Sequence, residues 1–210
     1  MKPLIDYSVY LVTDTVYFKD ENIWNKMEAA LAAGVTLVQY RDKTAASRIL
    51  YERALKMKAL CDKYNVPMLV DDRADIAFAV GAAGVHVGQS DLPAEIARRL
   101  LGADAIIGVS AHNADEALAA EAAGADYLGC GAVYPTGTKK DTSVIGTEGL
   151  KAIRAATGLH FVGIGGITLA NYGEVLAAGA NGAAVVSAIL GADDIEGTVK
   201  KFKQMSLQKL

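Results

Sequence analysis

Cysteine is scarce in this chain of 210 residues. Only Cys61 and Cys130 occur, far apart and without a Cys-x-x-Cys partner. This usage predicts two reduced thiols in the core of a cytoplasmic protein rather than a disulfide framework. No apolar run approaches the ~20 residues of a membrane span, and the first residues lack the apolar stretch of a signal peptide.

Excess charge is scarce as well, because the formal net charge is only −3. Nothing in that balance suggests a nucleic acid or an anionic membrane surface as partner. Any anionic ligand must therefore be held by a local cluster of donors. The abundant residues are small and apolar: 52% of the chain is hydrophobic and 21 residues are glycine, which suits an α/β protein with strands covered on both faces.

A short repeat organises the chain. Ala-Ala-Gly occurs at residues 32–34, 82–84, 122–124 and 177–179, each time followed by an apolar run. Each copy predicts a helix end, a glycine in the left-handed cap position and then a buried strand. Polar and charged residues follow these strands, so the chemistry is expected at that end of the strands.

Strand and helix patterns alternate eight times, at intervals of roughly 20–30 residues. The predicted strands are 9–13, 36–40, 67–70, 85–87, 105–109, 127–131, 160–164 and 183–186, and the predicted helices 23–33, 47–64, 74–82, 93–101, 114–122, 148–157, 169–177 and 195–205. Eight such units predict a single (β/α)8 TIM barrel domain over residues 1–210. The alternative is a doubly wound open sheet. The near-equal units and the lack of a Gly-x-Gly-x-x-Gly motif after the first strand disfavour it.

In a barrel, the loops that follow the strands share one face and carry the active site. Arg41, Lys43 and Lys139 supply cations there, and Asp72 and Asp91 supply carboxylates. Cations alone indicate a phosphate site. The added carboxylates indicate Mg²⁺ shared with a diphosphate, because Mg²⁺ typically takes one or two carboxylates together with phosphate oxygens.

A second anion site is predicted on the last strands. The loops after strands seven and eight of a barrel often bind phosphate through backbone N–H groups. Gly165, Gly166, Val186 and Ser187 lie there, and the segment 136–138 adds hydroxyl and backbone donors. Two phosphorylated small-molecule substrates, one of them a diphosphate with Mg²⁺, indicate a transfer reaction with diphosphate as leaving group.

These residues also match a family: the chain resembles the thiamine phosphate synthases along nearly its whole length. The matching segments are QYRDK at 39–43, DR at 72–73, HVGQSD at 86–91, GVS at 108–110, PTGTK at 135–139, GIGGI at 163–167 and VVSAI at 185–189. HVGQxD and PTxTK are specific in combination. The Gly-Gly pair and the strand-eight match are common to many phosphate-binding barrels.

The resemblance implies a magnesium-dependent transferase that joins an aminopyrimidine methyl diphosphate to a thiazole phosphate, or its carboxylated form, through a dissociative pyrimidine carbocation. The implied roles fall into four groups. Arg41, Lys139 and Ser110 act in catalysis, and Asp72 and Asp91 bind the metal. The pyrimidine diphosphate is held by Gln39, Arg41, Lys43, Asp71, Ser110 and Lys139, and the thiazole phosphate by Thr136, Gly137, Thr138, Gly166, Val186 and Ser187.

Two residues depart from the family pattern: Asp71 stands where Asn is usual, and Ala132 where Pro is usual. An ionised Asp accepts hydrogen bonds but donates none, so the role of Asp71 is open.

Alternatives remain at this stage. Asp71, Asp72, Asp91 and Ser110 all precede predicted helices and could act only as N-caps. A thiazole tautomerase or regulatory paralogue would share the barrel without the full diphosphate and metal set. A phosphosugar isomerase or epimerase would need a general acid–base pair. The sequence leaves a homo-oligomer open.

Overall fold

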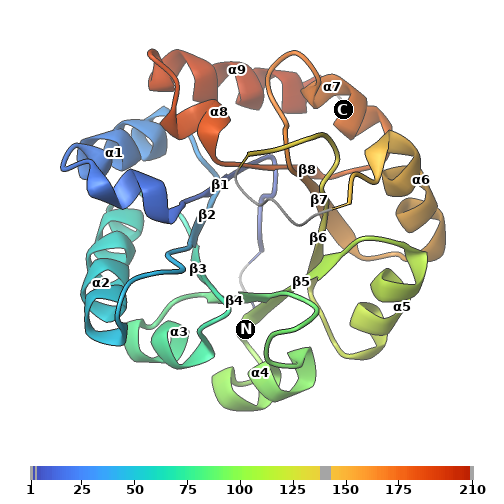
Figure 1. The fold of residues 1–210 in the computed structure, drawn as a ribbon, viewed down its shortest axis with the longest axis horizontal. Coiled ribbons are helices and arrows are strands. Elements are labelled where there is room, and N and C mark those ends of the chain that lie inside the picture. The colour runs from blue at the N-terminus through green and yellow to red at the C-terminus, as the bar shows by residue number, and fades with distance from the viewer. Residues whose placement is uncertain (1, 3, 138–142, 209–210) are drawn as a thin grey trace.

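The computed structural model describes residues 2, 4–137 and 143–208. Eight parallel strands close into a barrel in the order β1 to β8, with helices around it (Figure 1), so the predicted (β/α)8 barrel is confirmed. The strands are β1 (Val9–Val12), β2 (Leu37–Tyr40), β3 (Met68–Asp71), β4 (Gly84–Val87), β5 (Ile106–Ala111), β6 (Tyr127–Gly131), β7 (His160–Ile164) and β8 (Gly182–Val185). The helices are η1 (Thr15–Lys19), α1 (Ile23–Ala33), α2 (Ser47–Lys63), α3 (Ala74–Val80), α4 (Ala94–Leu101), α5 (Ala114–Ala122), α6 (Gly146–Ala156), α7 (Tyr172–Ala177), α8 (Ser187–Leu190) and α9 (Ile195–Leu207).

Strand alternation divides the apolar residues between two cores. Tyr10, Leu37, Leu69 and Tyr127 pack inside the barrel. The alternate residues of the same strands pack outward against the helices; Tyr40, for example, contacts Phe18 there. Because side chains alternate along a strand, the polar residues that continue the inward-facing row beyond β2 point toward the barrel axis.

The repeat marks the helix ends correctly in three of its four copies. Gly34, Gly124 and Gly179 have φ values of 113°, 83° and 101°, in the left-handed region. The prediction is wrong for Gly84, which begins β4. The capping glycine of α3 is Gly81, with φ 64°. A Cβ at Gly84 would lie 1.8 Å from the carbonyl oxygen of Ile106, so this glycine permits close approach of two strands.

Two short helical segments were not predicted. The 3-10 turn η1 follows β1, and α8 follows β8 directly. Both are too short to show the helical periodicity on which the prediction relied. Among the helices of the described residues, none combines the length and apolar character needed to cross a membrane.

Candidate active site

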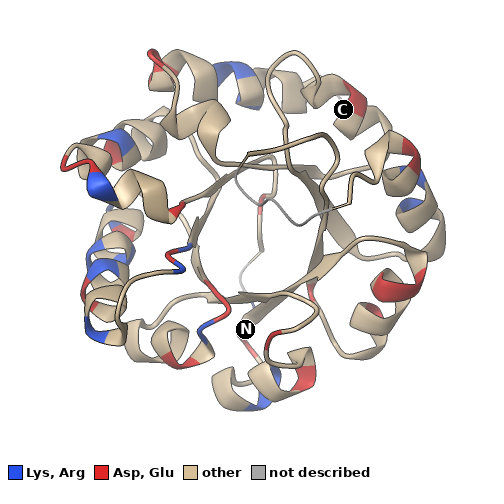
Figure 2. Ribbon diagram, viewed as in Figure 1, with Lys and Arg blue, Asp and Glu red and all other residues tan. Residues whose placement is uncertain are grey.

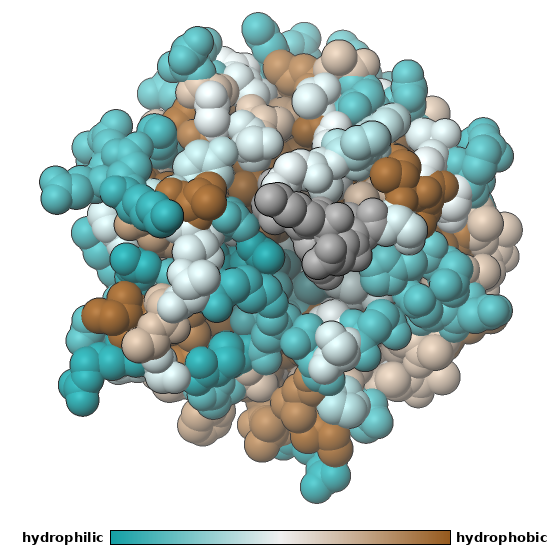
Figure 3. All heavy atoms as spheres, in the orientation of Figure 1, coloured by the Kyte–Doolittle hydropathy of each residue, from teal (hydrophilic) through white to brown (hydrophobic). Residues whose placement is uncertain are grey.

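A cavity of about 410 Å³ opens at the end of the barrel where the loops leave the strands. Figure 3 shows it as a hollow in the middle of that face, with hydrophilic residues along one side. All predicted site residues that the structure describes line it: Gln39, Arg41, Lys43, Asp71, Asp72, Asp91, Ser110, Thr136, Gly137, Gly166, Val186 and Ser187. Thr138 and Lys139 lie outside the described residues. Positions separated by up to 148 residues thus share one cavity, as the strand-end argument predicts.

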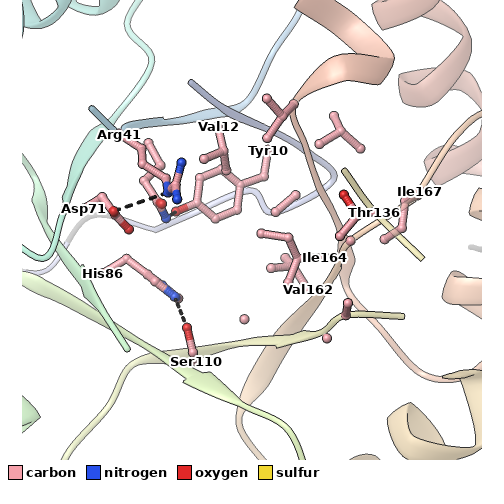
Figure 4. Close-up of a pocket in the computed structure, with 18 of the residues that line it drawn as sticks. Tyr10, Val12, Arg41, Asp71, His86, Ser110, Thr136, Val162, Ile164 and Ile167 are labelled. Atoms are coloured by element: carbon pink, nitrogen blue, oxygen red, sulfur yellow. Dashed lines mark hydrogen bonds and ion pairs between the residues drawn. The ribbon is translucent and has the colours of Figure 1, made fainter. Parts of the chain in front are cut away.

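The side of the cavity formed by β2 and β3 carries paired charges. Arg41 forms an ion pair with Asp14 at the end of β1, and its Nε lies 3.5 Å from Asp71 Oδ2 (Figure 4). Lys43 Nζ lies 2.9 Å from the same Asp71 oxygen and also pairs with Asp72. Both cations are therefore held over the cavity by carboxylates. Figure 2 shows these opposite charges together at the ends of β2 and β3.

Asp72 is an unusual carboxylate. Its backbone is in the left-handed region (φ 56°), and its N–H donates to the His86 carbonyl at 2.8 Å. Burial, and next the neighbouring charge of Asp71, raise the pKa of Asp72 to about 6, although Lys43 acts in the opposite direction. For Lys43 itself, burial favours a lower pKa, but Asp71 and Asp72 raise it on balance. Burial therefore disfavours the ionised form of Asp72, and a cation bound beside it would favour that form.

The N-cap explanation does not account for these residues. The N-cap positions of α3, α4 and α5 are Arg73, Pro93 and Asn113. Asp91 instead accepts a hydrogen bond at Oδ2 from the Gly88 N–H, 3.0 Å away, which holds its carboxylate over the loop after β4. Asp72, Asp91 and Ser110 therefore do not occupy the N-cap positions of these helices, and all three line the cavity.

The opposite side, formed by β6, β7 and β8, is built from backbone and small side chains. Gly166 has φ 64°, and a Cβ there would lie 2.5 Å from the carbonyl oxygen of Pro135. The loop after β6 lies on the end of β7, since Tyr134 N–H donates to the Gly165 carbonyl at 3.1 Å. Thr136 and Ser187 contribute hydroxyls. No Lys, Arg, Asp or Glu from β6, β7, β8 or the loops after them is among the described residues lining the cavity.

The floor of the cavity contains two polar residues missing from the predicted site, Tyr10 and His86. His86 Nδ1 lies 2.8 Å from the Tyr127 hydroxyl. His86 Nε2 lies 3.1 Å from Ser110 Oγ (Figure 4). A Cβ at Gly108 would lie 2.5 Å from His86 Nδ1, and one at Gly129 2.9 Å from its Cε1. Glycines at these strand positions make room for an inward histidine, and that pattern is the signal that could have found it.

The fold and cavity together define a (β/α)8 barrel enzyme whose site combines paired cations and carboxylates with a glycine-rich phosphate-type loop. Comparison with known proteins specifies the family. The family model described as thiamine monophosphate synthase matches residues 9–189. The chain is 46% identical over 209 residues to a thiamine-phosphate synthase of Ruminiclostridium cellulolyticum, covering 100% of both chains, and 47% identical over 203 residues to one of Clostridium beijerinckii, covering 97% of both.

A solved structure agrees. Thiamine phosphate pyrophosphorylase from Pyrococcus furiosus superposes with a TM-score of 0.86 at 38% identity, covering 98% of each chain. The chain belongs to the thiamine-phosphate synthase family, and it is a transferase of thiamine biosynthesis.

Proposed function

We propose that the protein joins 4-amino-2-methyl-5-(diphosphooxymethyl)pyrimidine to a thiazole phosphate, with Mg²⁺, releasing diphosphate and thiamine phosphate. The names of its relatives support the product, and the cavity supports the substrates. One side of the cavity offers cations and carboxylates for a diphosphate with its metal, and the other offers uncharged donors for a monophosphate.

The residues present fit Mg²⁺. No group of three or more His, Cys, Asp and Glu side chains within the described ranges is placed to hold a metal by protein ligands alone. A site with two carboxylates suits Mg²⁺, which keeps several water ligands and shares substrate phosphates. Asp72 and Asp91 would hold the ion, and it would supply charge neutralisation of the diphosphate.

The charged side would stabilise the leaving group. Arg41 and Lys43 would exchange their carboxylate partners for diphosphate oxygens as the C–O bond to the pyrimidine methylene breaks, with Lys139 assigned the same task from the family pattern. Little acid–base chemistry is needed at the reacting carbon. Neutralising the departing charge and holding both substrates in line are the main demands. Ser110, Gln39 and Asp71 would contact the pyrimidine or its diphosphate.

The uncharged side would hold the second substrate. Thr136, Gly137, Gly166, Val186 and Ser187 would bind the thiazole phosphate, together with Thr138 from the family pattern. A phosphate that is retained in the product needs placement more than charge neutralisation, and fixed backbone and hydroxyl donors provide it. The thiazole nitrogen would then attack the pyrimidine methylene carbon after diphosphate departs.

The cytoplasmic location and the homo-oligomer expected from the sequence remain predictions.

The observation that carries this proposal is the convergence of Arg41, Lys43, Asp72 and Asp91 on one cavity. The test mixes purified protein with Mg²⁺ and both phosphorylated substrates, and detects thiamine phosphate by fluorescence after oxidation. Product that disappears when either substrate is omitted or EDTA is added would support the proposal. A folded protein that makes no product would favour the tautomerase or regulatory paralogue instead.

A further inference from the structure

A hydrogen-bonded chain of side chains runs beneath the cavity. It links five strands in the order Gln39, Tyr10, Tyr127, His86 and Ser110, with successive distances of 2.7, 2.8, 2.8 and 3.1 Å. Only its two ends were predicted as substrate contacts. Tyr127 is fully buried and does not line the cavity, so any influence it has on a ligand must pass through its neighbours.

The two tyrosines keep their protons. Burial raises the pKa of Tyr10, and burial raises that of Tyr127 well above its ordinary value. Each hydroxyl therefore has one hydrogen to donate and can also accept. In a buried chain of such groups, the direction of one hydrogen bond sets the direction of the next.

The direction can be followed from Gln39. Its Nε2 donates to the Tyr10 oxygen. A head-to-tail chain then has Tyr10 donating to Tyr127, and Tyr127 donating to Nδ1 of His86. A neutral imidazole that accepts at Nδ1 carries its hydrogen on Nε2 and donates to Ser110 Oγ. The Ser110 hydrogen is thereby left to point onward.

We propose that Tyr127 is a positioning residue that, acting through His86, fixes Ser110 as a hydrogen-bond donor toward the ligand while Gln39 presents its carbonyl as an acceptor. This inference rests on the proposed function, because it assigns the edge of the pyrimidine ring that the site reads. A 4-aminopyrimidine has an N–H donor beside a ring-nitrogen acceptor, which complements Gln39 and Ser110. The 4-oxo ring has the opposite pattern, with a carbonyl acceptor beside a ring N–H.

The direction of the chain is tested without any substrate. The protein has three histidines, so ¹⁵N labelling of histidine gives three ring systems to resolve by NMR, recorded at about pH 8, above the ordinary histidine range. We expect His86 as the Nε2–H tautomer with an unprotonated Nδ1. A doubly protonated ring or an Nδ1–H tautomer in the wild-type protein overturns the proposal.

Substitution then tests the role of Tyr127. Tyr127→Phe keeps the ring and removes the hydroxyl between Tyr10 and His86, so the His86 nitrogen signals should shift. The matched control is Tyr7→Phe: the Tyr7 ring packs 4.9 Å from that of Tyr127 but is not part of the chain, so the His86 signals should stay. If Tyr127→Phe does not fold, Tyr10→Phe breaks the adjacent link and serves in its place.

The binding preference between two ligands distinguishes a positioning role of Tyr127 from a purely structural one. Calorimetry measures binding of the 4-amino and 4-oxo pyrimidine diphosphates with Mg²⁺ and without the thiazole. The wild type should prefer the amino ring, and Tyr127→Phe should reduce that preference about 10-fold, the effect of losing one oriented hydrogen bond to a ligand. Tyr7→Phe should keep it.

Equal weakening of both rings in Tyr127→Phe, with the preference unchanged, would mean a structural role and overturns the proposal. Failure of the wild type to bind either ring, together with no thiamine phosphate in the turnover assay, would instead overturn the proposed function. The NMR arm would still decide the direction of the chain in that case.

Discussion

The two sides of the cavity offer different groups to a ligand. On the side of β2, β3 and β4, the described lining residues include Arg41 and Lys43 together with Asp71, Asp72 and Asp91. On the side of β6, β7 and β8, they are glycines, small apolar residues and hydroxyls, with no charged side chain from those strands or the loops after them. Figure 2 shows the contrast at the strand ends. The two phosphate sites that we propose on this barrel therefore differ in their chemistry.

The difference between the two sides matches the different fates of the phosphate groups in the proposed reaction. A diphosphate that departs gains charge at the bond that breaks, so mobile cations and a metal stabilise the transition state more than the bound substrate. A monophosphate that remains in the product changes little, so a rigid cradle suffices. Under the proposed function, the charged side would need Mg²⁺ to complete its diphosphate site, whereas the uncharged side would bind its phosphate without a metal.

Removing a carboxylate from the charged side should cause the largest loss of turnover. Asp91→Ala should lower turnover by about 100-fold or more, because it removes one of two protein oxygens proposed for the metal. The Mg²⁺ concentration giving half-maximal rate should rise, while KM for the thiazole phosphate should change little. Steady-state rates against Mg²⁺ measure both.

Asp104→Ala is the control, since Asp104 lies on the loop between α4 and β5, after the helix rather than after a strand. It should retain the Mg²⁺ dependence. A normal Mg²⁺ response of Asp91→Ala would remove Asp91 from the metal site.

Substitution of Arg41 tests whether the charged side binds the diphosphate. Arg41→Ala should raise KM for the pyrimidine diphosphate and lower kcat, reducing kcat/KM by about 10–100-fold, because charge-assisted hydrogen bonds to a buried phosphate are each worth about 1.5–3 kcal/mol. Arg73→Ala is matched: Arg73 follows β3 but pairs with Asp75 outside the cavity. Equal losses in the two variants would indicate a general effect of lost positive charge.

Substitution of Gly166 tests whether the uncharged side binds the thiazole phosphate. Gly166→Ala imposes a side chain at φ 64° and places its Cβ against the Pro135 carbonyl, so the cradle should distort. KM for the thiazole phosphate should rise by about 10-fold, the equivalent of about 1.4 kcal/mol. The Mg²⁺ dependence should be retained. Gly173→Ala in α7 has open space for its Cβ and should behave as wild type. A changed Mg²⁺ response in Gly166→Ala would mean that the two sides are not independent.

The fold and the rim of the site could be predicted from sequence because both depend on local patterns. The alternation of eight strand and helix patterns predicts the barrel, and the barrel then places Arg41, Asp72 and Asp91 on one rim. The floor could not be predicted in this way. His86 and Tyr127 meet only because strands β4 and β6 flank β5, where Gly108 leaves room for both side chains. Such contacts depend on register and volume across strands, which a single segment does not encode. Gly84 shows the same limit: its sequence matches a helix cap, but the backbone of β5 determines its role.

The smallest expected effect concerns the stability of the charged side itself. In the folded protein the pKa of Asp72 is about 6, mainly through burial, whereas an exposed Asp titrates near 3.9. Between about pH 4 and 6, the folded state therefore holds a proton that the unfolded state has lost, so stability falls as pH rises through this window. Above it, the Asp72 charge destabilises the fold, and Asp72→Asn should raise the free energy of unfolding by roughly 1–2 kcal/mol at pH 8 and by almost nothing at pH 4. Urea denaturation with EDTA measures the free energy of unfolding at both pH values.

Asp75→Asn is the control, and it should lower the free energy of unfolding at pH 8. The hydrogen bond from Arg73 lowers the pKa of Asp75, so its ionised form stabilises the fold at that pH. A less stable Asp72→Asn at pH 8 would mean that the Lys43 pair outweighs burial. The charged side would then be stable without a metal, and the contrast with the preformed backbone side would disappear.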